Sequence, residues 1–300
     1  MLEKIIQDKK LAWDRTLRWD DAVIEFSKDK LMLFDEVIES KRRSETLENE
    51  ILNLKKNFLD NGPGFVIIEG LNKYIGNETE LEKVLLYISN ILGKAIPQNK
   101  QGELVKRVFD RGTKIEQKGR YSESRYGGDL HTDGAEIPYP VPKYLPLLCV
   151  RQAKSGGLFQ IVSAYSMHNK LLKEDKTVLK RLYEDFYWDR RGDLGPNGEE
   201  TFLKPVFSYK NNELCCSYLR TYINEGHRKE KKNLNELDIS ALNSMDKLLE
   251  DSSLVTNYLM KPGQLMISNN HFTLHGRTTF EDYAEDDKKR LLLRTWVIKN

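Results

Sequence analysis

Short apolar segments separated by turn-forming residues run from about residue 105 to the end of the chain, and they limit the fold more than any other feature. Apolar runs of this length, bounded by Gly, Pro and Asn, are typical of strands that pair in an antiparallel sandwich or barrel. The pattern predicts a β-rich core for this part of the chain. The segments are LVKRVF, YLPLLCVRQA, LFQIVSAY, FLKPVFSY, ELCCSYL, QLMISNN and RLLLRTWVI.

The N-terminal part has a different pattern. Residues 1–60 place apolar side chains largely three and four positions apart among abundant Glu and Lys, which predicts a helical region. Asn-Gly-Pro-Gly at residues 61–64 ends it, and Phe-Val-Ile-Ile at residues 65–68 has the composition of a buried strand. We expect the helices to pack on the β-rich core as an N-terminal extension, with a contact between two copies of the chain as the alternative.

Helical periodicity returns in three later segments. Residues 78–93 end on Gly93, at the position of a C′ glycine. Residues 164–184 and 234–250 interrupt the β-rich part with helix-like stretches. No internal repeat or low-complexity linker divides the chain, so we expect residues 1–300 to form one domain of the α+β class.

The balance of charges argues against nucleic acid as a partner. The 300 residues include 48 basic and 46 acidic side chains, which gives a net charge of +2 with no basic footprint. The one dense basic run, at residues 227–232, is read as a solvated loop or the start of a helix. A small-molecule partner fits this balance better.

Cysteine usage and hydropathy indicate a cytoplasmic protein. Three cysteines, two of them adjacent, form neither a disulfide framework nor a CxxC zinc spacing, so a reducing compartment is expected. The N-terminal sequence MLEKIIQDKK has charges where a signal peptide needs an apolar run. Nowhere do about 18 apolar residues follow one another, so we expect no membrane span.

A histidine and an aspartate two residues apart form the first candidate metal site. His131 and Asp133 share one face if the segment is extended, because alternate side chains of a strand point the same way. Two histidines and one carboxylate leave three positions of an octahedron open, which suits Fe(II) and its oxygen chemistry. The second histidine must come from elsewhere, and His275 follows the strand-like QLMIS segment.

The other three histidines are weaker candidates. His271 lies four residues before His275, but this spacing makes a metal pair on a helix and the segment reads as strand and turn. His168 lies in a helix-like stretch and is interpreted as a surface or packing residue. His227 belongs to the basic run and is expected to be exposed.

Two arginines near the C-terminus indicate an anionic ligand. Arg290 and Arg294 stand four residues apart in a strand-like run, so they share a strand face at a separation of ~13 Å. Guanidinium groups on so apolar a strand need anionic partners, and an arginine fork matches a carboxylate in two hydrogen bonds. A dicarboxylate co-substrate would supply one such partner.

The order of these motifs resembles the taurine dioxygenase (TauD/TfdA) family and its clavaminate-synthase-like relatives. The resemblance covers roughly residues 60–300, and the collected order is far more specific than any one motif. The matching segments are Gly62-Pro63-Gly64-Phe65-Val66, Leu92-Gly93 with Pro97-Gln98, Leu130-His131-Thr132-Asp133-Gly134, Gln152-Ala153 with Gly156-Gly157, Leu274-His275-Gly276-Arg277, and Lys289-Arg290-Leu291-Leu292-Leu293-Arg294.

The resemblance implies a fold and a set of roles. The fold would be a double-stranded β-helix, a jelly roll with flanking helices, whose mouth holds Fe(II) on His131, Asp133 and His275. Arg290 would bind the distal carboxylate of the co-substrate 2-oxoglutarate, and Arg294 an acidic group of the primary substrate. By a looser match, Gln98 would also contact that substrate.

One departure from the family pattern concerns 2-oxoglutarate. After the glycine pair the family commonly has a Thr or Ser that helps to hold this co-substrate, whereas this chain has Leu158-Phe159-Gln160. Either Gln160 or Ser163 takes over that contact, or Arg290 works with fewer partners. Residues 121–126 (YSESRY) either line the substrate cavity or form a polar loop.

The implied activity is the O2-dependent oxidation of a small carboxylate-bearing substrate, such as an amino acid or its derivative, with release of succinate and CO2. Asp133 favours hydroxylation over chlorination, with desaturation or epoxidation as other outcomes. A different reading is a non-catalytic jelly roll that binds a metal or a ligand. A zinc hydrolase is disfavoured because no HExxH motif is present. The sequence is compatible with a homo-oligomer and does not specify the oligomeric state.

Overall fold

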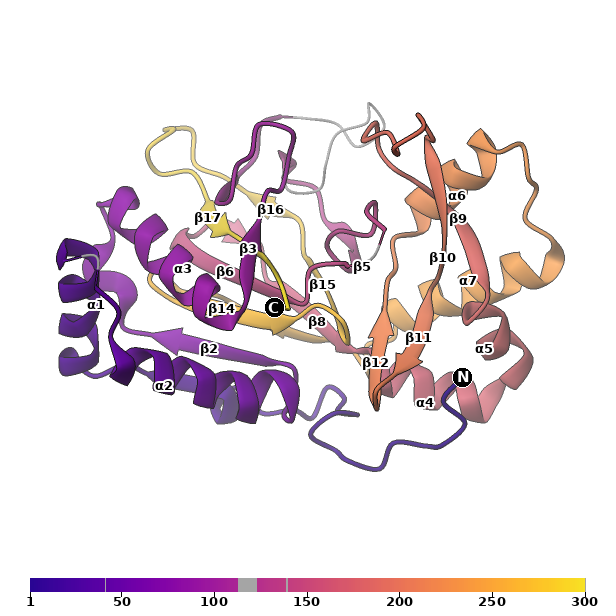
Figure 1. Cartoon of the computed structure of the whole chain (residues 1–300), viewed down its shortest axis with the longest axis horizontal. Helices are drawn as coiled ribbons and strands as arrows, with labels where there is room; N and C mark the ends of the chain where they lie inside the picture. Colours follow the sequence, from indigo (N-terminus) through magenta and orange to yellow (C-terminus); the bar gives the residue numbers. More distant parts are fainter. Residues whose placement is uncertain (41, 113–122, 139, 300) are drawn as a thin grey trace.

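The chain has a mixed α/β fold in which most strands pair antiparallel (Figure 1). The computed structural model describes residues 1–40, 42–112, 123–138 and 140–299. None of the helices in these ranges is both long and apolar enough to cross a membrane. The helices are α1 (Lys28–Ser40), α2 (Glu45–Leu54), α3 (Glu78–Leu92), α4 (Ala164–Glu174), α5 (Lys176–Leu182), α6 (Arg220–Lys229) and α7 (Glu236–Leu249), with short turns of helix at Trp19–Ala22, Lys55–Asp60 and Leu71–Tyr74.

The larger sheet has eight strands, and its order is β1-β2-β14-β6-β17-β4, with β18 joined to β6 and β3 joined to β18. Every pair in it is antiparallel except β1 with β2. The strands are β1 (Val23–Glu25), β2 (Phe65–Glu69), β3 (Lys94–Ile96), β4 (Lys106–Val108), β6 (Tyr144–Arg151), β14 (Leu265–Asn269), β17 (Leu291–Arg294) and β18 (Trp296–Ile298).

The smaller sheet has four antiparallel strands in the order β13-β8-β15-β5. Three two-stranded pairs complete the strand list: β9 with β10, β11 with β12, and β7 with β16. The bounds are β5 (Gly128–His131), β7 (Ser155–Gly156), β8 (Phe159–Ser163), β9 (Asp185–Asp189), β10 (Thr201–Pro205), β11 (Phe207–Lys210), β12 (Glu213–Cys216), β13 (Thr256–Tyr258), β15 (Thr273–Arg277) and β16 (Phe280–Glu281).

The two sheets enclose one apolar cluster, and each also packs against helices. In β2, Phe65 and Ile67 join the cluster between the sheets, whereas Val66 and Ile68 join a second cluster with the N-terminal helices. Successive side chains of a strand point to opposite faces, so a sheet covered on both sides reads as a continuous apolar run. This explains the unbroken FVII and LLL segments.

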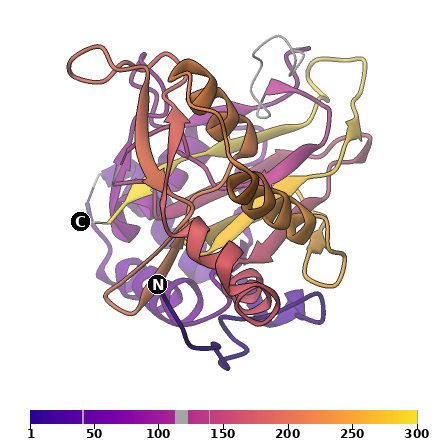
Figure 2. The ribbon, with the colours of Figure 1, turned by 90° about the vertical axis from the view of Figure 1, so that its right-hand side faces the viewer.

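The helices form two groups on opposite sides of the sheets (Figure 1). The N-terminal helices α1, α2 and α3 cover the larger sheet. The segment between β8 and β13 supplies α4 to α7, and a third apolar cluster joins these helices to Leu130, Val162 and Leu274 of the smaller sheet. In the turned view the orange helices lie across the strands (Figure 2).

The expectation of a helical region over residues 1–60 is only partly right. The helices α1 and α2 are present, but residues 1–18 contain no helix, and the helical turn Trp19–Ala22 and then β1 follow them. This first segment makes local turn hydrogen bonds, such as Ala12 N–H to the Asp8 carbonyl, and also bonds to distant parts of the chain. Asn169 pairs with both the N–H and the carbonyl of Ile6, and the Trp13 indole donates to the Pro63 carbonyl at 2.7 Å.

The later helices confirm the sequence pattern, with one difference at Gly93. Residues 164–184 form α4 and α5, which meet at Asp175, the N-cap of α5. Gly93 follows α3, but its φ of 171° is extended rather than left-handed. A Cβ at Gly93 would lie 2.2 Å from the Ile298 carbonyl oxygen, so glycine is needed there for the close approach of β18.

Candidate active site

Three residues predicted as metal ligands lie together at one end of the smaller sheet. His131 ends β5 and pairs directly with His275 in the middle of β15, and Asp133 follows in the turn after β5. The Nε2 atoms of His131 and His275 lie 3.6 and 3.9 Å from Oδ1 of Asp133. The three ligand atoms all lie within 4.8 Å of one another, which is close enough to share one metal ion.

The charge states of this group suit a divalent metal. Burial lowers the pKa of His275 to about 3, which keeps its imidazole neutral. Burial by itself would raise the pKa of Asp133, but the Arg294 guanidinium, aided by His131 and His275, holds that pKa well below its usual range. A metal needs deprotonated ligands, so the neutral His275 imidazole beside an ionised carboxylate fits Fe(II).

The orientation of His131 is set by the backbone. Its Nδ1 lies 2.8 Å from the carbonyl oxygen of Asp129, which fixes Nδ1 as the protonated nitrogen and leaves the Nε2 lone pair for the metal. His275 is held differently, because its ring stacks on Phe159 at 5.8 Å and an interplanar angle of 8°. Both rings are therefore positioned before a metal binds.

Oδ2 of Asp133, referred to below as its outer oxygen, has two hydrogen-bond partners. Sequence reasoning anticipated neither of them in this role. Arg294 Nη1 lies 2.9 Å from Oδ2, and the Trp296 indole N–H donates to the same oxygen at 2.9 Å. Trp296 stands two residues after Arg294, so strand periodicity places both side chains on one face. That periodicity was the available signal for Trp296.

The main chain of Asp133 is held by Asn270, which sequence reasoning also missed. The Asn270 side chain accepts from the Asp133 N–H at 2.8 Å and donates to the Asp133 carbonyl at 2.9 Å. It also donates to the Pro142 carbonyl at 2.9 Å. Because Asn270 lies in the turn between β14 and β15, it ties the aspartate to the turn that leads into the strand of His275.

Arg290 faces the same pocket and has no anionic partner there. It is 7% exposed, and its guanidinium makes neither a hydrogen bond nor an ion pair with the residues that the structure describes. The group lies over the Phe280 ring at 5.1 Å, and burial lowers its pKa. A buried cation without a counter-ion is costly, so this position favours an anionic ligand.

A glycine makes room for Arg290. Gly157 has a φ of +70°, and a Cβ there would lie 3.3 Å from Nε of Arg290. The neighbouring position 156 also requires glycine, because a Cβ there would clash with the Thr279 carbonyl oxygen. The glycine pair thus lets β7 and β16 close over the arginine.

Gln98 lies behind Arg294 rather than among the residues that line the pocket. Its Oε1 accepts from Arg294 Nε at 2.9 Å, and its Nε2 donates to the carbonyls of Arg294 and Leu104 at 2.8 and 3.0 Å. Gln98 is 3% exposed. In this arrangement Gln98 orients Arg294, and its direct contact with substrate stays a prediction.

Neither residue expected to assist Arg290 reaches the pocket. Gln160 donates to Asn257 on the outer face of the smaller sheet, and the Ser163 hydroxyl donates to the Leu11 carbonyl. The described residues around the pocket offer no hydroxyl or amide side chain. They are Val108, Gly128, His131, Leu145, Leu147, Phe159, His275, Gly276, Arg277, Arg290, Leu292 and Arg294.

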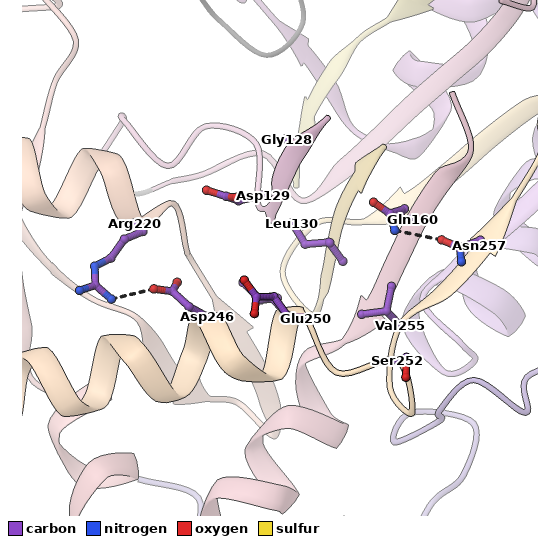
Figure 3. Close-up of a pocket in the computed structure, with 11 residues that line it drawn as sticks. Gly128, Asp129, Leu130, Gln160, Arg220, Asp246, Glu250, Ser252, Val255 and Asn257 are labelled. Carbon is purple, nitrogen blue, oxygen red and sulfur yellow. Dashed lines mark hydrogen bonds and ion pairs between the residues drawn. The ribbon is translucent and has the colours of Figure 1, made fainter. Parts of the chain in front are cut away.

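A larger cavity, of about 650 Å³, lies on the other side of the smaller sheet (Figure 3). Gln160 pairs with Gly276, next to His275, so its side chain points away from the metal ligands. The cavity contains the Arg220–Asp246 ion pair at 2.8 Å, and Glu250 lies nearby (Figure 3). Of the residues predicted for the site, His131, His275, Arg290 and Arg294 line the smaller pocket and not this cavity.

The remaining histidines lie outside the group of three, with His168 and His227 buried and His271 half-buried. His271 was the competing ligand, but its Nε2 is buried and unpaired among the described residues. His168 bonds to the Tyr183 hydroxyl at 2.9 Å, as a packing residue. The expectation of an exposed His227 is wrong. It is 8% exposed, because α6 packs against β9 and His227 accepts from the Tyr187 N–H.

Residues 121–126, which precede β5, are only partly described. Tyr121 and Ser122 lie outside the described residues. The main-chain carbonyls of Ser124 and Arg125 accept hydrogen bonds from Arg277, whose guanidinium lies over the Phe280 ring at 4.7 Å. Arg277 therefore holds this segment against β15.

Comparisons with known proteins identify a family and several relatives. The model of the "Taurine catabolism dioxygenase TauD, TfdA family" matches residues 45–296. FR-33289 synthase of Streptomyces rubellomurinus (strain ATCC 31215) is 27% identical over 242 residues, which are 80% of this chain and 70% of that protein. Uridine-5'-phosphate dioxygenase of Streptomyces sp is 28% identical over 172 residues, 55% of this chain and 59% of that protein.

Two solved structures share the fold. Asparagine oxygenase, in complex with Fe(II), 2S,3S-3-hydroxyasparagine and succinate, has a TM-score of 0.71 at 19% identity and covers 92% of this chain and 93% of its own. The non-haem iron oxygenase OrfP, with Fe and α-ketoglutaric acid, has a TM-score of 0.63 at 18% identity and covers 90% and 85%. The chain therefore belongs to the TauD/TfdA family and is a dioxygenase that depends on Fe(II) and 2-oxoglutarate.

Proposed function

We propose that this enzyme hydroxylates a small carboxylate-bearing substrate, such as an amino acid or its derivative, with release of succinate and CO2. In this proposal residues 1–300 form one domain, and the two facing sheets are a double-stranded β-helix, or jelly roll. The pocket between them would be its mouth, with His131, Asp133 and His275 as the ligands of Fe(II).

The observation that carries the proposal is the guanidinium of Arg290, which has no hydrogen-bond or ion-pair partner among the described residues and lines the same pocket as His131 and His275. A buried arginine fork needs a planar anion, and the distal carboxylate of 2-oxoglutarate is one. The pocket around it is otherwise apolar, since Val108, Leu147 and Leu292 line it. With no hydroxyl or amide partner in the described lining, Arg290 would hold this carboxylate with fewer partners than the family commonly uses.

Each residue has a stated task in the proposed reaction. His131, Asp133 and His275 would hold the metal on one side and leave the other side to the co-substrate and O2. Arg290 would orient 2-oxoglutarate, and the apolar lining would exclude water. When bound, the iron and 2-oxoglutarate supply the oxidation of the substrate by O2.

The substrate class rests on charge and on the named relatives. The solved relatives act on asparagine or bind L-Arg, and a curated relative acts on uridine 5'-phosphate, so each named ligand carries an anionic group. Arg294 lines the pocket, and its contacts to Asp133 and Gln98 leave further N–H groups free to face a ligand. We assign the acidic group of the substrate to Arg294, and the Asp133 carboxylate favours hydroxylation over chlorination.

An anaerobic titration tests this function. The metal-free protein receives Fe(II) and then 2-oxoglutarate, and the visible charge-transfer band of the chelate is followed. We expect the band in the native protein and none in His131→Ala. Arg290→Met should need roughly 100-fold more 2-oxoglutarate, because a charge-assisted bidentate contact contributes about 3 kcal/mol.

Arg151→Met is the matched control. Arg151 ends the neighbouring strand β6, but it pairs with Glu78 and the Lys289 carbonyl outside the pocket. Its replacement should leave the titration unchanged. An equal loss in both arginine variants would assign the effect to the strands rather than to co-substrate binding. Product analysis with candidate amino acids then separates hydroxylation from desaturation and epoxidation.

A further inference from the structure

We infer that Trp296 and Arg294 act together as positioning residues that hold the outer oxygen of Asp133, so that Asp133 offers a single oxygen to the metal. The inference rests on the proposed function, because it takes Asp133 as a ligand of Fe(II). It gives Trp296 a task in the metal centre and gives Arg294 a second task beside binding the substrate.

The two oxygens of Asp133 have different surroundings. Oδ2 accepts from Trp296 Nε1 and from Arg294 Nη1, each at 2.9 Å. Oδ1 faces the two histidines, whose Nε2 atoms lie 3.6 and 3.9 Å away. Two donors on one oxygen occupy its lone pairs, so only the other oxygen is free for an ion at the centre of the three ligands.

The donors that hold Oδ2 are themselves fixed. Gln98 accepts from Nε of Arg294 and donates to the Arg294 main-chain carbonyl. It therefore fixes both the side chain and the main chain of Arg294. Arg294, Trp296 and Gln98 are 9%, 5% and 3% exposed. The Arg294 guanidinium also lies over the Trp296 ring at 5.2 Å. Because these donors are buried and packed, they lose little conformational entropy when the metal ion binds. The Asp133 carboxylate is therefore preorganised.

A one-oxygen ligand matters because of the sites it leaves open. Two histidines and a carboxylate bound through one oxygen occupy three positions of an octahedron, and a carboxylate bound through both oxygens would occupy a fourth. The co-substrate and O2 together need all three remaining positions. The contacts of Trp296 and Arg294 therefore protect the position that O2 requires.

Trp296→Phe in the full-length protein tests the inference with Co(II) as the probe. The substitution keeps an aromatic ring and removes the single N–H donor to Oδ2. We expect Co(II) to bind about 10- to 100-fold more weakly, as is usual when a partner of a metal ligand is lost. We also expect the d–d spectrum of bound Co(II) to shift toward higher coordination as the freed oxygen turns to the metal.

Trp188→Phe is the matched control. The Trp188 indole is also buried and donates one hydrogen bond, to the Lys204 carbonyl at 2.7 Å. It lies in the apolar cluster that joins α4 to α7 to the smaller sheet. Its loss should lower thermal stability and leave Co(II) affinity and spectrum unchanged. Gln98→Met is the second variant, because it frees Arg294 and leaves Trp296 in place, and it should weaken Co(II) binding to a smaller extent.

The outcomes separate this inference from the proposed function. Tight binding by the native protein, with the same affinity and spectrum in both Trp296→Phe and Gln98→Met, would overturn the inference and leave the function intact. Equal weakening in Trp296→Phe and Trp188→Phe would overturn it as well, since the effect would then be a general loss of stability. A native protein that binds neither Co(II) nor Fe(II) would overturn both.

Discussion

Asn270 shows how one side chain can connect two parts of a metal site. Its amide satisfies both polar main-chain groups of Asp133 and the carbonyl of Pro142, and it is 1% exposed. Asn270→Leu would leave three buried groups unpaired. We expect the free energy of unfolding to fall by about 3 kcal/mol or more, since each such group costs about 1–3 kcal/mol. Urea unfolding of the metal-free protein measures it, and metal affinity should fall too.

Asn169 offers a matched comparison at the residue scale. It holds the N–H and the carbonyl of Ile6 in the same way, but far from the metal ligands. Asn169→Leu should also lower stability, with metal affinity unchanged. If both variants lost metal affinity equally, the role of Asn270 at Asp133 would be refuted.

The turn between β7 and β8 is the element that decides the shape of the space around Arg290. Gly157→Ala adds a methyl group 3.3 Å from Arg290 Nε in a backbone conformation with φ of +70°. We expect the KM for 2-oxoglutarate to rise about tenfold, which corresponds to about 1.4 kcal/mol of lost binding. Fe(II) affinity should stay the same, because the turn touches none of the three ligands. Steady-state kinetics with varied 2-oxoglutarate checks this.

Gly198→Ala separates crowding from backbone strain. Gly198 has a φ of +86°, but a Cβ there would meet nothing within 4 Å. The substitution therefore adds similar strain, about 1–2 kcal/mol, without contact to Arg290. Its KM for 2-oxoglutarate should equal that of the native enzyme. A raised KM in both variants would show that strain alone explains the effect.

The whole molecule should lose stability in mild acid because it buries neutral histidines. Burial lowers the pKa of His168 to about 4 and also lowers the pKa of His227 and His271. An unfolded histidine has a pKa of about 6.5, so below that pH the unfolded chain binds more protons than the folded chain. Stability is therefore full above pH ~6.5 and falls toward pH ~4.

Urea unfolding of the metal-free protein between pH 7.5 and 5 measures this dependence, above the range in which most carboxylates titrate. His168→Gln removes one of the buried groups and should reduce the slope by up to about 1.4 kcal/mol per pH unit. An unchanged slope in that variant would mean that His168 is protonated in the folded chain.

The sequence by itself identified the residues that gather at the candidate site. Strand periodicity predicted that Arg290 and Arg294 share a face, and both line the pocket. Asp133 lies in the turn after β5 and is near His131 because only one residue separates them. The same periodicity placed α3, the helices in 164–184 and α7, because local apolar patterns record which face is buried. Family membership followed from the order of these motifs.

Only the tertiary structure decided which distant segments meet. The register that sets His131 opposite His275, the convergence of Trp296 and Arg294 on one oxygen of Asp133, and the path of residues 1–18 all depend on contacts between distant parts of the chain. No local pattern encodes such pairs, because a side chain's own periodicity fixes its face but not its partner. The packing of the two sheets selects these partners, because most buried polar groups must form a hydrogen bond across the core.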